Sequence, residues 1–185
     1  MSGEPQPAKE RTEGFLKPVD YSHRSLYRRP PDLYLRSQSL GHLLTALGAV
    51  PSYVVNLEVP GRRSGVVRRT TLVQTSSGGD DYLVALAGES DWVRNVRAAK
   101  GRVVIGRRER RSARLVEVPP GERAPVIHSY LFRAGRSPSS KAAAREARYY
   151  FGLNPNPSLE EIQQVASYYP VFRVEKLGQE PAAPE

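Results

Sequence analysis

Short runs rich in β-branched and aromatic residues recur through the middle of the chain and alternate with Gly, Pro and charged residues. Runs of this kind predict β-strands. Most of them follow one another through short turn-like segments, which favours antiparallel hairpins. We expect six strands, at 52–59, 66–75, 81–88, 102–107, 112–118 and 169–177, with SSGGDD as the loop between the second and the third.

Helical periodicity is confined to the flanks and to one short central segment. Leucines at helical spacing in 32–50 predict an amphipathic helix, and Ser90 is a suitable N-cap for a helix over 90–100. Further helices are expected at 119–133, 141–151 and 158–167. Because helices do not alternate with strands, a doubly wound parallel sheet is disfavoured. The pattern predicts a mainly β, α+β fold in which an antiparallel sheet curls into a small barrel with peripheral helices.

The chain length of 185 residues is sufficient for one domain with a real core. We expect a flexible N-terminal arm at 1–31, a single domain at 32–177 and a disordered tail at 178–185. The start of the chain lacks an apolar core, so a soluble, cytoplasmic protein is expected. The helix at 32–50 could instead lie on a membrane surface, which leaves a peripheral membrane contact open.

The absence of cysteine and the excess of positive charge narrow the chemistry. Without Cys, and with three His that lack metal-ligand spacing, no metal site is expected. The 28 Lys and Arg outnumber the 19 Asp and Glu, which gives a formal charge of +9. An anionic partner is therefore expected, and a nucleic acid, a lipid surface or a phosphate-bearing cofactor would each satisfy it. Composition alone could also account for much of the total.

The segment PGRRSGVVRR concentrates polar groups at one turn between two expected strands. Its side chains are Arg62, Arg63 and Ser64, followed after Gly65 by Arg68 and Arg69. Successive strand residues face opposite ways, so one of the last two arginines can join the turn. Guanidinium groups, a hydroxyl and the amides of a Gly-rich turn suit phosphate or clustered carboxylates. A solvated basic hairpin is the alternative.

The run GESDWVRN follows the third expected strand and carries the single Trp of the chain. Trp92 and Asn95 share a helix face at a spacing of three. Taken alone, the pair is better explained by Trp92 as a core anchor and Asn95 as a surface residue. The basic stretch at 94–114 has the character of a solvated face, and it lacks the interleaved aromatic residues with which nucleic-acid-binding strands stack bases.

The order of these features, GRRSG, GESDW and WVRN followed by a strand of the RVVI type, resembles the deazaflavin-dependent nitroreductase family. The resemblance covers about 53–118. It implies a split β-barrel of the FMN-binding type and an oxidoreductase that uses the reduced deazaflavin coenzyme F420. The implied reaction is hydride transfer to an electron-poor acceptor such as a quinone, an enone or a nitroaromatic.

The same resemblance implies roles for individual residues. The turn residues Arg62, Arg63, Ser64 and Gly65, with Arg68 or Arg69, would hold the phosphate and acidic tail of the coenzyme. The loop Ala87, Gly88, Glu89 and Ser90 would lie against its ring system, and Trp92 and Asn95 would complete the pocket wall. A flat ring needs an apolar slot, and a polyanionic tail needs fixed cations.

Two features depart from the family pattern or leave alternatives open. The loop GESDW is shorter and more acidic than the Gly-rich stretch of family members. The substrate-side tyrosines are matched only by order, with Tyr130 as the candidate proton donor.

An FMN-binding split barrel is the nearest alternative enzyme, and a basic nucleic-acid-binding barrel is the alternative outside enzymes. A homodimer is also expected to be possible, since barrels with exposed edges often pair.

Overall fold

The computed structural model describes residues 19, 21, 27, 50–137 and 139–177. Nearly all of the helix expected at 32–50 and the whole tail at 178–185 lie outside the described residues. The domain boundaries therefore stay predictions. Two described residues of the expected arm contact the domain: the Tyr21 hydroxyl donates to the carbonyl oxygen of Phe151 at 2.8 Å, and Tyr27 forms an antiparallel bridge with Gly88.

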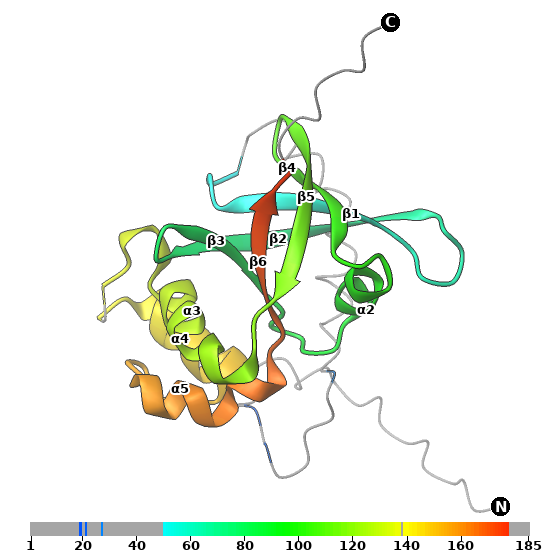
Figure 1. The fold of residues 1–185 in the computed structure, drawn as a ribbon. Coiled ribbons are helices and arrows are strands. Elements are labelled where there is room, and N and C mark those ends of the chain that lie inside the picture. The colour runs from blue at the N-terminus through cyan, green and yellow to red at the C-terminus, as the bar shows by residue number, and fades with distance from the viewer. Residues whose placement is uncertain (1–18, 20, 22–26, 28–49, 138, 178–185) are drawn as a thin grey trace, which may run out of the picture.

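Six antiparallel strands close into a barrel in the order β1-β2-β3-β6-β5-β4 (Figure 1). Their bounds are β1 Val54–Pro60, β2 Val67–Ser77, β3 Asp80–Val84, β4 Arg102–Gly106, β5 Arg110–Glu117 and β6 Val171–Lys176. The fold class expected from the sequence is confirmed. Closure follows because β6, the last strand in the sequence, lies between β3 and β5.

The barrel interior is filled by alternate residues of the strands. In β1 these are Val55, Leu57 and Val59, each at most 6% exposed. They pack with the short helix α2 (Asp91–Ala98), which covers one end of the barrel. Burial of these side chains contributes about 1.5–3 kcal/mol each to folding.

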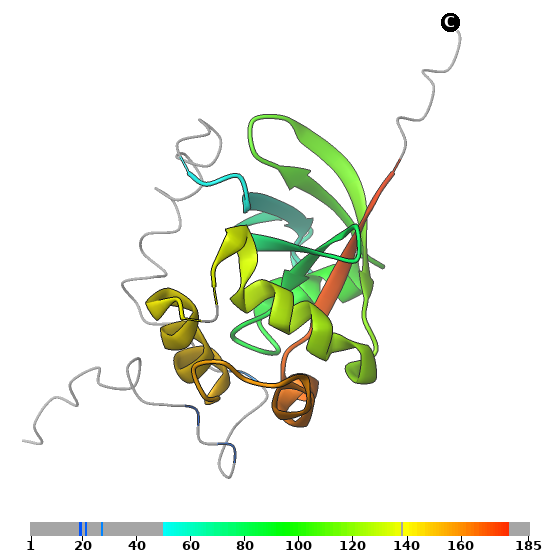
Figure 2. The ribbon, with the colours of Figure 1, turned by 90° about the vertical axis from the view of Figure 1, so that its left-hand side faces the viewer.

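A second apolar cluster lies between the barrel and the remaining helices. These are α3 (Arg123–Leu131), α4 (Lys141–Phe151) and α5 (Leu159–Val165), with short 3-10 turns η2 (Pro120–Glu122), η3 (Arg133–Gly135) and η4 (Ala166–Tyr168). In Figure 1 the three α-helices gather on one side of the barrel, away from α2, and Figure 2 views the barrel from their side. The barrel therefore has two differently covered sides.

Two expected boundaries were wrong, for local reasons. The expected six-residue loop SSGGDD is a tight two-residue turn, because Gly78 and Gly79 both adopt positive φ and let β2 and β3 continue to its edge. The third strand ends at Val84 instead of Gly88, because Gly88 also takes a positive φ and its N–H bonds back to the carbonyl of Ala85.

The helix expected at 119–133 is also interrupted. It consists of the 3-10 turn η2 and the α-helix α3, followed by η3. The expectation for 158–167 holds in a similar form, since α5 begins with the capping box of Ser158 and Glu161 and continues into η4.

Candidate functional site

The arginine turn, residues 61–65, joins β1 to β2 at one end of their ladder. The Gly61 N–H donates to the carbonyl of Val66 at 2.9 Å, and the Gly65 N–H donates to the carbonyl of Gly61 at 2.8 Å. Gly65 has a φ of +69°, a conformation that costs side chains about 1–2 kcal/mol. The two glycines thus fix a compact turn whose polar side chains project from its backbone.

Two polar side chains converge above Gly61. A Cβ placed on this glycine would lie 3.3 Å from the Ser64 Oγ and 3.4 Å from the Arg68 Nε. The space that they share therefore exists only because residue 61 lacks a side chain. Between the two strand arginines, Arg68 is the one that lies beside the turn. Arg69 faces the other way and pairs with Glu58 at 3.0 Å.

The Arg62 side chain is bound to residues of α2. Its Nη1 lies 3.0 Å from the Asn95 Oδ1 and 3.0 Å from the Asp91 Oδ1, and its backbone N–H also donates to Asn95 at 3.2 Å. Asn95 is 4% exposed, so its expected place on the surface was wrong. It fastens the arginine turn to the helix.

The guanidinium groups of Arg63, in the arginine turn, and of Arg68, on β2 beside it, are available to a ligand. Both are exposed, and within the described part of the chain neither guanidinium takes part in a hydrogen bond or an ion pair. The backbone of the turn is fixed by its own hydrogen bonds, and the N–H donors of these two guanidinium groups are free. This combination suits an anionic ligand. Of the arginines that the sequence singled out here, these two keep their full donor capacity.

The loop at 87–90 connects the helical side of the barrel to α2. Leu86, just before it, packs against the cluster that includes Tyr130, and Ser90 occupies the N-cap position of α2. The Ser90 side chain makes no capping bond, contrary to expectation, and its buried hydroxyl has no hydrogen-bond partner in the part of the chain that the structure describes. The loop thus holds an unsatisfied polar atom between the two clusters.

Glu89, the acidic residue of this loop, is held by α2. Its carboxylate receives Nη1 and Nη2 of Arg97 at 2.6 and 2.9 Å. The acidic departure from the family pattern is therefore neutralised within the fold. Ala87 remains half-buried beside the buried Gly88.

Trp92 anchors the barrel core. It is 8% exposed and its ring lies 5.5 Å from the ring of Phe172. Its contact with a coenzyme stays a prediction, as does that of Asn95.

Tyr130, the candidate proton donor, lies in the helical cluster. It is 2% exposed, between the guanidinium of Arg133 at 4.2 Å and the ring of Phe151 at 6.4 Å. A proton-donating role would require a substrate to reach this enclosed position, and the role stays a prediction.

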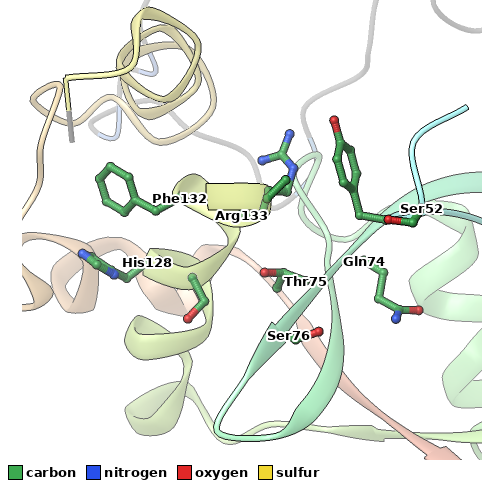
Figure 3. Close-up of a pocket in the computed structure, with 10 residues that line it drawn as sticks. Ser52, Gln74, Thr75, Ser76, His128, Phe132 and Arg133 are labelled. Carbon is green, nitrogen blue, oxygen red and sulfur yellow. The ribbon is translucent and has the colours of Figure 1, made fainter. Parts of the chain in front are cut away.

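A cavity that sequence reasoning missed lies between the far end of β2 and α3. It has a volume of about 590 Å³. In Figure 3, His128 and Phe132 lie on one side, Ser52 and Gln74 on the other, and Arg133 and Thr75 between them. Its lining is Ser52, Tyr53, Gln74, Thr75, Ser76, His128, Ser129, Phe132, Arg133 and Ala134. These residues come from three distant segments without a common motif, so no local pattern could have marked them.

The charges beside the cavity do not cancel. Glu146 accepts from Arg133 at 2.7 and 3.0 Å and from Arg136 at 2.9 Å. Burial alone raises the pKa of Glu146, but the hydrogen bonds and charges of Arg133 and then Arg136 hold it below its ordinary value. Two guanidinium groups thus share one carboxylate, which leaves a net positive charge.

The cavity and the arginine turn lie at opposite ends of β1. Pro60 pairs with Val67 next to the turn, whereas Val54, which follows Tyr53, pairs with Val73 next to Gln74. Seven strand residues span about 20 Å. A ligand that uses both places must be elongated.

The model of the F420H(2)-dependent quinone reductase family matches residues 27–130, more than half of the chain. The chain belongs to this family. It is an oxidoreductase that reduces its substrate with F420H2 as coenzyme, as the resemblance implied. The expected small-molecule redox substrate agrees with membership of this family.

Fifteen solved chains match this sequence in a comparison of structures, and three of them are the following. The F420-H2 dependent reductase FDR-A is 21% identical over 66% of this chain and 94% of that chain, with a TM-score of 0.40. A structure described as a domain-swapped dimer is 20% identical over 79% and 100%, with a TM-score of 0.43. Rv2991 from Mycobacterium tuberculosis, a conserved hypothetical protein, is 15% identical over 88% and 97%, with a TM-score of 0.35. No curated protein matches the chain significantly.

The remaining expectations concern the surroundings of the protein. No helix among the described residues is long and apolar enough to cross a membrane. The same residues contain no cluster of three or more His, Asp or Glu that could hold a metal ion. Cytoplasmic location, peripheral membrane contact, a homodimer and the exclusion of nucleic acid stay predictions.

Proposed function

We propose that this F420-dependent reductase acts on a quinone, with an enone or a nitroaromatic as the alternative acceptors. Reduced F420 supplies a hydride when bound. The observation that carries the coenzyme site is the convergence of the Ser64 hydroxyl and the Arg68 guanidinium above Gly61, next to the free cation of Arg63. An acidic, phosphate-bearing tail matches these donors.

Each residue of the coenzyme site has a separate task in this proposal. Arg63, Ser64 and Arg68 bind the tail, whereas Arg62 and Asn95 hold the arginine turn on α2. The loop at 87–90 borders the ring, where its half-buried Ala87 offers an apolar contact and excludes water.

The cavity between β2 and α3 is the proposed acceptor site. A quinone that receives hydride gains negative charge on an oxygen, and the net positive charge of Arg133, Arg136 and Glu146 stabilises that charge. The cavity wall also offers two groups that can donate a proton, the Tyr53 hydroxyl and the His128 imidazole. Both are more accessible than Tyr130, which is fully enclosed.

The test of the coenzyme site is a fluorescence titration of F420 with the wild-type protein and with Arg63→Gln and Arg68→Gln. We expect each substitution to weaken binding by roughly tenfold or more, since a charge-assisted hydrogen bond contributes about 1.5–3 kcal/mol. Arg102→Gln is the matched control. This variant removes the same charge from an exposed position on β4 and should bind as the wild type does.

Three results would reject or redirect the proposal. Equal losses in all three variants would mean that only the overall charge matters, and the arginine turn would lose its role. Tighter binding of FMN than of F420 in a parallel titration would favour the FMN alternative. Steady-state rates with a quinone, an enone and a nitroaromatic then rank the acceptors by kcat/KM, and the proposal requires the quinone to rank first.

A further inference from the structure

A continuous chain of charged side chains runs from the loop at 87–90 to the start of α3. Arg97 forms its centre. Besides its two bonds to Glu89, it donates Nε and Nη2 to Glu117 at 2.7 and 2.8 Å. Glu117 in turn accepts from Nη2 of Arg123 at 3.1 Å. We call Glu89, Arg97, Glu117 and Arg123 the charge chain.

The far end of the charge chain is rigid. Arg123 is 5% exposed, and its Nε and Nη1 donate to the carbonyl oxygens of Val118 at 2.8 Å and Tyr169 at 3.2 Å. These bonds connect the ends of β5 and η4 to the first residue of α3. The bond from Arg123 therefore fixes the position of the Glu117 carboxylate, at the end of β5, from which it accepts the bonds of Arg97.

Arg97 uses four of its N–H groups in two bidentate pairs. Its pKa is raised, first by the hydrogen bonds to Glu117 and then by those to Glu89. Isolated surface ion pairs contribute little, but bidentate geometry within a network is the exception. Two acids and two arginines also leave the charge chain neutral, so its members need no counter-ion from solvent.

The loop at 87–90 depends on this connection. Its backbone bonds are local: the Gly88 N–H donates to Ala85, the Ser90 N–H donates to Gly88, and the Ser90 carbonyl accepts from the Arg94 N–H in the first turn of α2 at 3.2 Å. In the described part of the chain, none of these bonds ties Gly88 or Glu89 to α2 or to β5. Gly88 adds conformational freedom, since its φ of +73° is open to glycine. Among the described residues, the bridge from Tyr27 to Gly88 is the other link of this loop to a distant segment.

We propose that Arg97 is a positioning residue, which holds the loop at 87–90 in the single conformation that borders the coenzyme ring. This inference rests on the proposed coenzyme site. Arg97 lies two positions beyond Asn95, about 200° away around the helix, so it does not share a side of α2 with the arginine turn. The arginine turn, which is proposed to bind the coenzyme tail, and Arg97, which is proposed to hold the loop at 87–90, therefore lie on different sides of α2.

The first measurement needs no coenzyme. Amide hydrogen exchange of Gly88, Glu89 and Ser90 is compared between the wild type, Arg97→Gln and Arg94→Gln. Arg94 is the matched control, because it lies exposed on the same helix and its side chain has no partner among the described residues, while its backbone bond to Ser90 is kept in the variant. We expect roughly tenfold faster exchange in Arg97→Gln, while protection in the barrel core and in Arg94→Gln is unchanged.

The second measurement is the Kd for F420 by fluorescence. Arg97→Gln should weaken binding by roughly tenfold, the double variant Glu89→Gln with Arg97→Gln should lose no more than that, and KM for the acceptor should stay the same. Arg97→Lys, which can contact one carboxylate at a time, should fall between the two and serves if Arg97→Gln does not fold.

The outcomes separate the inference from the proposed function. If the wild type does not bind F420, the proposed function fails, and faster exchange in Arg97→Gln would reduce the inference to a loop without a coenzyme role. If the wild type binds F420 and Arg97→Gln binds equally well, the positioning role is wrong. Equal acceleration of exchange throughout the barrel would also overturn it, because Arg97 would then contribute only to global stability.

Discussion

Asn95 connects two segments that lie 33 positions apart in the sequence. Its Oδ1 is the acceptor for both the backbone N–H and the Nη1 of Arg62, and it does this from a buried position. A buried acceptor that satisfies a backbone donor stabilises the fold and the conformation of the arginine turn together. The sequence alone does not show this, because the spacing of Trp92 and Asn95 marks only a shared helix face.

Replacement of Asn95 should separate its hydrogen bonds from its packing. Asn95→Leu leaves the Arg62 N–H without its partner and should lower the free energy of unfolding by about 1–3 kcal/mol. Asn95→Asp keeps an oxygen acceptor facing Arg62 and should retain more of that stability. Urea unfolding of the three proteins measures the difference, and equal losses in Leu and Asp variants would contradict a hydrogen-bonding role.

The side chains of the candidate site show how far sequence reasoning reaches. The GRRSG motif located the arginine turn, since its glycines and arginines are neighbours in the chain. It could not assign the arginines individually, because the partners that occupy Arg62 and Arg69 come from α2 and from β1. Arg63 and Arg68 were separated from them only by tertiary contacts.

At the scale of elements, α2 is short but has contacts in three directions. One side enters the barrel core through Trp92, another holds Arg62, and a third holds the charge chain through Arg97. The helix ends where Lys100 adopts a φ of +53° and the Gly101 N–H bonds to the carbonyl of Val96 at 2.9 Å. This ending is a Schellman-type cap with a strained non-glycine residue.

Lys100→Gly should stabilise the protein. Glycine avoids the cost of the left-handed conformation, about 1–2 kcal/mol, and gives back part of it as conformational entropy, so a net gain of about 0.5 kcal/mol is expected. Ala98→Gly is the matched control on the same helix and should instead destabilise by up to about 1 kcal/mol. Thermal unfolding compares the two, and a lower Tm for Lys100→Gly would show that the lysine side chain contributes more than the strain costs.

The strands and helices were predictable where a local signal exists. Runs rich in β-branched and aromatic residues located the six strands, and Ser158 with Glu161 marked the start of α5. Ends that depend on positive φ at Gly88, or on the passage from η2 into α3, were displaced by a few residues. The pairing of β6 between β3 and β5 depends on contacts far apart in sequence, which periodicity cannot give.

At the scale of the whole molecule, ion pairs connect the helices beside the cavity to one another. Arg133 follows α3, Glu146 belongs to α4, and Arg136 lies between them, so one carboxylate joins both helices. Cation–π contacts of Arg133 with Tyr53 at 5.5 Å and Tyr130 at 4.2 Å connect the same group to the start of β1 and to α3. The arrangement of the two arginine side chains beside the cavity therefore depends on the charge of one carboxylate, that of Glu146.

Glu146→Gln should reveal that dependence through pH. The pKa of Glu146 is lowered in the folded protein, so its stabilising contribution is complete above the ordinary pKa near 4.5 and is lost as the pH falls through the folded value. At pH 7 the variant should lose about 2 kcal/mol in the free energy of unfolding, because Gln keeps an acceptor but not the charge. Below pH 4.5 the wild type should lose this advantage, so the two unfolding curves should approach each other. Urea unfolding at pH 7 and at about pH 3 tests this, with Glu160→Gln on the exposed face of α5 as control. A difference that does not change with pH would mean that Glu146 acts through its shape and not through its charge.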